Sequence, residues 1–334
     1  MNVQYMSALI AVVVLGFLAY IGTEFLGLNS LFGIFIPYLA VCFFLVGAIL
    51  KVMKWAKSPV PFRIPTTCGQ QKSLDWIEQN KIDNPSTTPG VIARMFFEVL
   101  LFRSLFRNTK AGIKEGKITY EWEIFLWVGA LAFHYSFLTV LVRHMRFFLE
   151  PVPGLIGIVE TLDGFFQVGT PGVLLSGVVL LGAVLFLLSR RLLIPQVRYI
   201  SLMADYFPLF LIIGIAGTGI YMRYFARVDV VAIKQLAMSL VTLHPAIPQN
   251  VTVSGILYVH LFLVSVLFAY FPLSKLMHMG GVFLSPTRNL ANNSRMERHI
   301  NPWNPDLKFH TYEAYENDFR EKMIEAGLPV EKEA

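Results

Sequence analysis

The chain has 334 residues, of which 55% are hydrophobic and 15% are charged, and its formal net charge is +6. A soluble domain has about 25% charged residues, so the composition excludes an ordinary soluble fold and indicates a membrane protein. The basic excess is typical of the loops of such a protein and does not indicate nucleic-acid binding. The two cysteines are too few for an iron–sulfur cluster, and no CxxCH motif is present to attach a haem covalently.

Six segments are apolar enough to cross a bilayer as helices, for which about 20 residues are needed. The first lacks the basic region and the cleavage site of a signal peptide, so we expect it to be retained. In chain order the expected helices are Val3–Ile21, Leu31–Leu50, Trp122–Val142, Val173–Leu188, Tyr206–Tyr221 and Ile256–Leu276. The sequence therefore predicts an all-α, polytopic membrane helix bundle.

Basic residues are distributed unevenly over the two sides of this bundle. Of the 28 lysines and arginines, 23 lie after the second, fourth and sixth helices and only five lie on the opposite side. Because basic residues concentrate in cytoplasmic loops, we expect both termini to be cytoplasmic and the protein to lie in the cytoplasmic membrane.

Two polar regions on that side carry features of their own. Within the long connection 51–121, the segment Val91–Phe106 alternates charged and apolar residues as an amphipathic helix does. Such a helix either lies on the inner membrane surface or docks a partner, and the pattern does not choose between the two. The tail from Ser285 to Ala334 is polar, and we expect a solvated or partner-bound extension.

Four of the seven histidines fall on two of the predicted helices, which is unusual because ionisable side chains are costly at membrane depth. His134 and His144 belong to the third helix, and His260 and His278 belong to the sixth. The two helices run in opposite directions, so His144 can face His260 near the outer surface and His134 can face His278 near the inner one. A straight helix would place His260 and His278 five full turns and about 27 Å apart, against about 15 Å for His134 and His144.

Two facing histidines can ligate a haem iron from both sides, which gives an electron carrier without an open coordination position. A zinc or copper site would need three or four ligands at one depth, whereas two lie at each depth here. Haem propionates are anions, so Arg143 and Arg146 beside His144, and Lys275 before His278, are candidate propionate contacts. The same three cations could instead be interfacial charges that set topology.

The spacings His134-x9-His144 and His260-x17-His278 resemble those of the cytochrome b subunit of respiratory nitrate reductases. That family has a five-helix core with two non-covalent b-type haems and takes electrons from quinol. The resemblance implies the same histidine pairs and a di-haem core over residues 31–281, which includes the long connection 51–121. Residues 1–30 then form an extra N-terminal helix with a short outer loop, and residues 282–334 form a cytoplasmic tail.

The extra helix and the long connection, with Thr67-Cys68-Gly69-Gln70-Gln71 and Asn301-Pro302-Trp303, look more like the cytochrome b subunit of the DsrMKJOP complex. That complex serves dissimilatory sulfur metabolism, and near relatives serve complexes like heterodisulfide reductase. The resemblance implies menaquinone as substrate and a cytoplasmic iron–sulfur partner subunit related to heterodisulfide reductase. It also implies further membrane subunits in the same complex.

A quinone needs apolar walls, hydrogen-bonding groups and a nearby haem, and two regions of the sequence meet that description. The outer region, which the resemblance favours, contains His144, Arg146, Glu160, Asp163 and His244. The inner region contains Arg190, Asp205, Tyr206 and Lys275. Alternative functions are a transporter, which would show helices broken at mid-membrane, for instance at Gly214–Gly219, and a structural anchor without haem.

Overall fold

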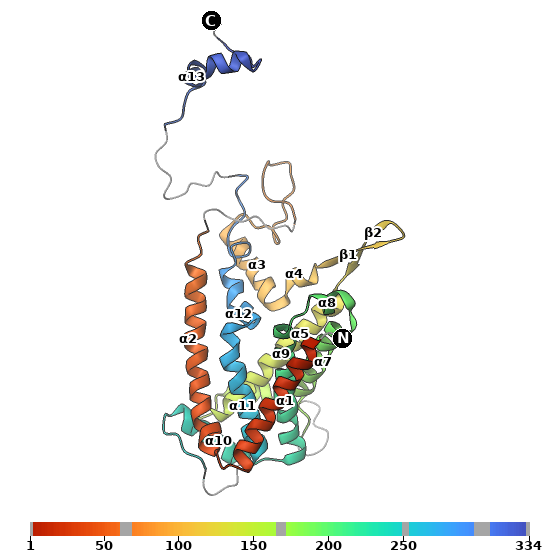
Figure 1. The fold of residues 1–334 in the computed structure, drawn as a ribbon, viewed down its shortest axis with the longest axis vertical. Coiled ribbons are helices and arrows are strands. Elements are labelled where there is room, and N and C mark those ends of the chain that lie inside the picture. The colour runs from red at the N-terminus through yellow and green to blue at the C-terminus, as the bar shows by residue number, and fades with distance from the viewer. Residues whose placement is uncertain (1–2, 61–68, 165–171, 249–253, 297–307, 332–334) are drawn as a thin grey trace.

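The computed structural model describes residues 3–60, 69–164, 172–248, 254–296 and 308–331, and these form a helical bundle with polar extensions at one end (Figure 1). Thr67, Cys68 and the Asn301-Pro302-Trp303 motif lie outside the described residues. The six expected membrane helices are all present. They are α1 (Val3–Glu24), α2 (Ile36–Ala56, after the π-helix η1, Leu31–Phe35), α5 (Ile124–His144), α7 (Leu175–Leu193), α9 (Met203–Tyr221) and α11 (Gly255–Tyr270).

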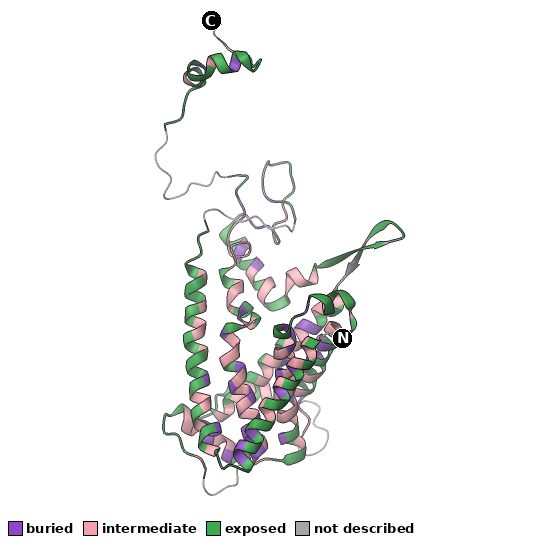
Figure 2. Ribbon diagram, viewed as in Figure 1, coloured by how far each residue is buried: buried purple, intermediate pink, exposed green. Residues whose placement is uncertain are grey.

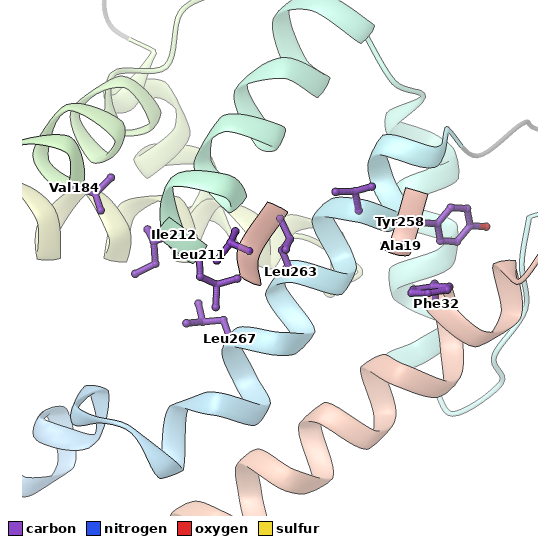
Figure 3. Close-up of a cluster of buried hydrophobic side chains, with 10 residues drawn as sticks. Ala19, Phe32, Val184, Leu211, Ile212, Tyr258, Leu263 and Leu267 are labelled. Atoms are coloured by element: carbon purple, nitrogen blue, oxygen red, sulfur yellow. The ribbon is translucent and has the colours of Figure 1, made fainter. Parts of the chain in front are cut away.

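The core of the bundle lies where α1, α9 and α11 pack together. Ala19 of α1, Leu211 of α9 and Leu263 of α11 are almost completely buried there, and Figure 3 shows this cluster. Gly214 allows the close approach, because a Cβ atom at that position would lie 3.2 Å from Leu263 Cδ1. The additional N-terminal helix is therefore an integral part of the core.

Helix α5, which carries His134 and His144, lies at one side of the bundle and packs mainly on α7. Gly129 brings the two helices together, since a Cβ atom there would lie 2.5 Å from Phe186 Cε1. Helix α2 lies at the other side, against α11, and most of its surface is exposed (Figure 2). Apolar side chains exposed on these helices are what a bilayer would cover.

The sixth helix differs from the continuous helix expected over Ile256–Leu276. Helix α11 ends at Tyr270, and two 3-10 turns follow, η4 (Phe271–Leu273) and η5 (Lys275–Met277), before the short helix α12 (His278–Gly281) and the turn η6 (Val282–Leu284). Pro272 lacks a backbone N–H, and Ser274 begins the next turn by accepting a hydrogen bond from Leu276 N at 3.1 Å. The expectation of five straight turns between His260 and His278 is therefore wrong.

The long connection on the inner side folds over the end of the bundle. Its amphipathic segment forms α3 (Thr88–Leu101) and α4 (Arg103–Phe106), separated by Phe102 in a left-handed conformation (φ 50°). Trp127 and Tyr135 of α5 donate hydrogen bonds to the carbonyls of Leu101 and Leu100, at 2.7 and 2.8 Å. These bonds fix the C-terminal end of α3 to the helix that carries His134.

Part of the tail packs onto this connection. Asn292 is 1% exposed, donates to Asn84 Oδ1 at 2.6 Å and, through its backbone N–H, to Pro85 O at 2.7 Å. Arg288 pairs with Glu98 at 2.9 Å, which ties the tail to α3. Residues 285–296 are therefore part of a folded inner unit together with residues 69–107, and the name "inner unit" is used below for these two segments.

Several smaller elements were not expected from the sequence. A hairpin of β1 (Thr109–Lys114) and β2 (Lys117–Trp122) leads into α5, with Ile113 paired to Ile118. The short helices are α6 (Gly154–Asp163), α8 (Pro195–Ile200) and α10 (Val230–Val241), with the 3-10 turn η2 (Met145–Phe147) after α5 and the π-helix η3 (Met222–Ala226) after α9. Helix α13 (Tyr312–Glu325) stands apart from the bundle near the C-terminus (Figure 1).

Candidate functional site

The inner histidine pair is brought together although 144 positions separate its members in the sequence. His134 lies midway along α5 and His278 is the first residue of α12, and their ring centres are 6.0 Å apart with the ring planes at 86°. An iron–nitrogen bond of about 2 Å on each side, with about 1 Å from each nitrogen to its ring centre, would place two axial imidazoles roughly 6 Å apart. The spacing of this pair therefore fits a single metal ion between the two rings.

The outer pair consists of His144, the last residue of α5, and His260 in α11. Both side chains are half-buried. Helix α5 packs mainly on α7, whereas α11 packs on α1, α2 and α9. The two helices that carry this pair thus make little backbone contact, which would suit a flat cofactor held between their side chains.

All four histidines have a partner at Nδ1, which is the arrangement expected of metal ligands that bind through Nε2. Three of them bond to a backbone carbonyl and the fourth bonds to a hydroxyl. The Nδ1 partners are Ala130 O for His134 at 2.8 Å, Val140 O for His144 at 2.7 Å, Lys275 O for His278 at 2.8 Å and Thr218 Oγ1 for His260 at 2.9 Å. With the Nδ1 proton held in this way, Nε2 carries the lone pair that a haem iron requires.

No group of three or more histidine, cysteine or acidic side chains gathers anywhere in the described parts of the chain. The arrangement is two histidines at each of two depths. This donor set fits bis-histidine haem ligation and does not fit a tetrahedral zinc site.

Arg143 lies in a buried polar cluster at the outer end. Its guanidinium pairs with Asp163, the last residue of α6, and the two side chains are 12% and 5% exposed. Asp163 also accepts hydrogen bonds from the backbone N–H and the hydroxyl of Ser176, both at 2.7 Å. The buried Nε of Arg143 has no acceptor among the described residues, so one donor beside His144 is left for an anionic group such as a propionate.

Arg146 and Lys275 are each engaged by an acidic side chain. Arg146 pairs with Glu160 at a partly exposed position. Lys275 Nζ lies 2.7 Å from Asp205 Oδ1, where the lysine side chain is 75% exposed and the aspartate side chain 7%. A propionate at either cation would therefore have to share it with a carboxylate, and Lys275 contributes to the inner pair chiefly through its backbone carbonyl.

The remaining residues considered for a quinone site are placed as follows. His244 is exposed in the turn after α10, with its Nδ1 2.7 Å from Thr242 O. Arg190 pairs with Glu123 at 2.9 Å, where the end of α7 meets the start of α5. Tyr206 is fully buried, and its hydroxyl lies 3.4 Å from Arg191 O. Arg190 and Tyr206 are thus engaged by other residues of the bundle, whereas Asp205 and Lys275 pair with each other.

Two features of the site were missed from the sequence. One is the hydroxyl of Thr218, which reaches His260 from a neighbouring helix. The other is a cavity of about 220 Å³ at the outer end, one helical turn before His260. Its walls come from the end of η3, the segment before α10, α10 itself and the start of α11, namely Ala226, Arg227, Val228, Asp229, Ala232, Ile233, Ser254 and Leu257. No short motif marks either feature, because each is created by packing between helices.

At the inner pair, aromatic rings contact His134, while both histidines remain exposed. The ring of Phe102, between α3 and α4, lies edge-on to His134 with a centre-to-centre distance of 4.9 Å, and Phe133 lies on His134 at 5.1 Å. The amphipathic segment of the long connection is therefore in direct contact with the inner histidine pair.

Comparison with known proteins agrees with this geometry. The family model described as "Nitrate reductase gamma subunit" matches residues 93–298, which include all four histidines. A protein of Archaeoglobus fulgidus named "Hdr-like menaquinol oxidoreductase cytochrome b-like subunit" is 43% identical over 283 residues, covering 83% of this chain and 85% of its own length. A protein of the same name from Archaeoglobus profundus is 40% identical over 278 residues, covering 81% and 82%.

The family match spans more than half of the chain, and the two relatives align over most of both lengths. They support the resemblance found in the histidine spacings, the extra helix and the long connection. The chain belongs to the nitrate reductase gamma-subunit family and, within it, to the cytochrome b subunits of the DsrM type.

Proposed function

We propose that this protein is a membrane di-haem cytochrome b subunit that exchanges electrons between menaquinol and a cytoplasmic iron–sulfur partner. The observation that carries the proposal is the inner pair, with ring centres 6.0 Å apart and Nε2 left for a metal ion on each ring. A haem held between two histidines supplies a one-electron carrier. The chain's own part is to hold both rings in the ligating tautomer and to keep the pairs at different depths.

The proposal predicts two b-type haems per chain. Since no CxxCH motif is present, both should be extractable into acidified solvent. The measurement is a pyridine haemochrome assay on purified, folded protein, in which a value near two per chain is expected. A well-folded preparation with less than one haem per chain would contradict the proposed di-haem function and favour a structural anchor without haem.

We place the menaquinol site at the outer end, by the pair His144–His260. The cavity of about 220 Å³ lies there, and its apolar walls are joined by Arg227, Asp229 and Ser254. It is smaller than the roughly 300–1,000 Å³ of a site that encloses a whole ligand. That size suits a quinone head group whose isoprenoid tail remains in the bilayer.

The orientation of the bundle follows from the charge distribution. The structure places the long connection after α2, the turn after α7 and the tail after α12 at the same end of the bundle, and these segments hold most of the basic residues. We therefore propose that this end, with both termini, is cytoplasmic. A reporter enzyme that is active only after export should be inactive when fused after Ala334 and active when inserted in the outer segment between α6 and α7. Activity at the C-terminus would reverse the topology.

The partner is proposed to dock on the cytoplasmic face. The names of the relatives point to a menaquinol oxidoreductase of the heterodisulfide-reductase type, so an iron–sulfur subunit is the natural electron carrier to receive from the inner pair. The inner unit lies directly over His134, through Phe102, and would be the surface nearest that pair. Further membrane subunits and a role in dissimilatory sulfur metabolism follow from the same resemblance.

A transporter is disfavoured by α9. A transporter would show helices broken at mid-membrane, and Gly214–Gly219 was the candidate for such a break, but α9 is a continuous helix from Met203 to Tyr221. A structural anchor would not require two histidine pairs in which every Nδ1 atom makes a hydrogen bond within the chain.

A further inference from the structure

His260 differs from the other three histidines in what holds its ring. The Nδ1 atoms of His134, His144 and His278 bond to backbone carbonyls three or four residues earlier in their own segments. The Nδ1 atom of His260 lies 2.9 Å from Thr218 Oγ1, which belongs to α9. The outer pair is therefore held by a side chain from a helix that carries no haem ligand.

The Thr218 hydroxyl is itself oriented by its own helix. Its oxygen lies 2.8 Å from Gly214 O and 3.0 Å from Ile215 O, so the hydroxyl proton can be donated to the preceding turn. The oxygen then accepts the Nδ1 proton of His260. In this arrangement the imidazole has its proton on Nδ1 and its lone pair on Nε2.

Gly219 locates the ring of His260 against the same helix. A Cβ atom at this position would lie 3.4 Å from His260 Cε1 and 3.9 Å from Nδ1, which are ordinary van der Waals distances. The Nδ1–Cε1 edge of the ring therefore lies against α9 at the Thr218–Gly219 step, where the threonine provides the acceptor.

We infer that Thr218 is the positioning residue of the outer haem, fixing the rotation and tautomer of His260 and lowering the reduction potential at that site. This inference rests on the proposed di-haem function. A hydrogen bond donated by Nδ1 increases the electron density that Nε2 offers to iron, and this stabilises the ferric state more than the ferrous state. Loss of the acceptor should therefore raise the midpoint potential of the outer haem and leave the inner haem unchanged.

The test is Thr218→Val, which keeps the shape of the side chain and removes the hydroxyl. At the midpoint potential of the wild-type outer haem, the wild-type haem is half reduced. Loss of a hydrogen bond of ordinary net strength should raise the ratio of reduced to oxidised outer haem in the variant about two- to tenfold at that potential. For a one-electron couple this corresponds to about 20–60 mV. The measurements are an optical redox titration and the low-spin ferric electron paramagnetic resonance signal, with haem content determined in parallel.

Two further variants serve as controls. Thr218→Ser keeps the hydroxyl and should restore the wild-type potential. Thr139→Val removes a hydroxyl of the same kind from α5, where Oγ1 bonds Tyr135 O at 2.8 Å and touches no histidine, and should change neither haem. The outer component is identified independently as the one lost in His260→Ala.

A selective shift or a selective loss of the outer haem in Thr218→Val supports the inference. An unchanged outer potential and signal, or an equal disturbance of both haems, overturns it. Absence of haem from the wild-type protein would instead defeat the proposed function, so the two failures are distinguishable.

Discussion

His134→Ala and His278→Ala should each lower the haem content from two to one per chain, and both should remove the same redox component. The rings of these residues lie 6.0 Å apart on different elements, so neither has a substitute ligand nearby among the described residues. Removing one axial ligand leaves a five-coordinate haem without its coordinate bond to the second segment, and a b-type haem then dissociates readily. The measurement is haem content together with a redox titration of the purified variants.

His144→Ala and His260→Ala should remove the other component by the same reasoning, leaving the inner haem at its wild-type potential. The matched control is His244→Ala, which alters an exposed histidine in the turn after α10 and should retain both haems. The pairing would be wrong if His134→Ala and His144→Ala abolished the same component. It would also be wrong if His244→Ala lost a haem.

The His134–His278 pairing could be predicted because it depends on chain direction alone. Antiparallel helices bring the start of one to the end of the other, whatever their tilt, so the break in the sixth helix did not affect the result. The break itself was missed, although Pro272 was visible in the sequence as a residue that cannot donate to the preceding turn. The expectation failed because the apolar run continues through the proline and periodicity alone suggested one helix.

The features that could not be predicted arise from contacts between distant segments. Ala19 gives no sign in the sequence that α1 occupies the centre of the bundle, because all six membrane helices are apolar on every side. Asn292 looked like part of a solvated tail, and its burial depends on the carbonyl of Pro85 and the side chain of Asn84. Thr218 looked like an ordinary membrane threonine, and only the packing of α9 on α11 places it beside His260.

The structure distinguishes the three cations that were candidate propionate contacts. From the sequence, Arg143, Arg146 and Lys275 were equivalent candidates for propionate contacts. In the structure, Arg143 alone is buried and retains an Nε donor without an acceptor among the described residues, whereas Lys275 is a largely exposed partner of Asp205. Arg143 is therefore the strongest proposal of the three, and the other two remain proposals with competing carboxylates.

The isolated chain should accept electrons from a menaquinol analogue but should not turn over a sulfur substrate. We propose that the cavity of about 220 Å³, which begins one helical turn before His260, takes the quinone head group, and Phe102 of the inner unit contacts His134 of the inner pair. The sequence has neither enough cysteines for a cluster nor a flavin or dinucleotide motif, so we expect electrons that reach the inner pair to pass to the proposed partner subunit. Stopped-flow reduction of the haems measures electron transfer from the menaquinol analogue. An assay of sulfur-substrate turnover, with and without the partner, measures whether the partner is required.

Helix α13 is the part of the tail to remove in testing how that polypeptide docks. Its Tyr315 and Phe319 rings lie 4.9 Å apart and are 49% and 41% exposed, which makes them an apolar surface outside the bundle. Deletion of residues 309–334 should weaken binding of the partner at least tenfold while both haems remain, since a buried aromatic pair commonly contributes more than ~1.4 kcal/mol to an interface.

The point of truncation decides what such an experiment means. A deletion from Asn292 would also remove the hydrogen bonds to Asn84 and Pro85, so it would disturb the inner unit and could not separate docking from folding. Tyr315→Ser with Phe319→Ser isolates the aromatic surface, and Tyr312→Ser, a half-exposed tyrosine at the start of the same helix, is the matched control. Full-strength binding by the 309–334 deletion would place the docking surface on the inner unit alone. Turnover of a soluble sulfur substrate by the chain without any partner would contradict the proposed relay function itself.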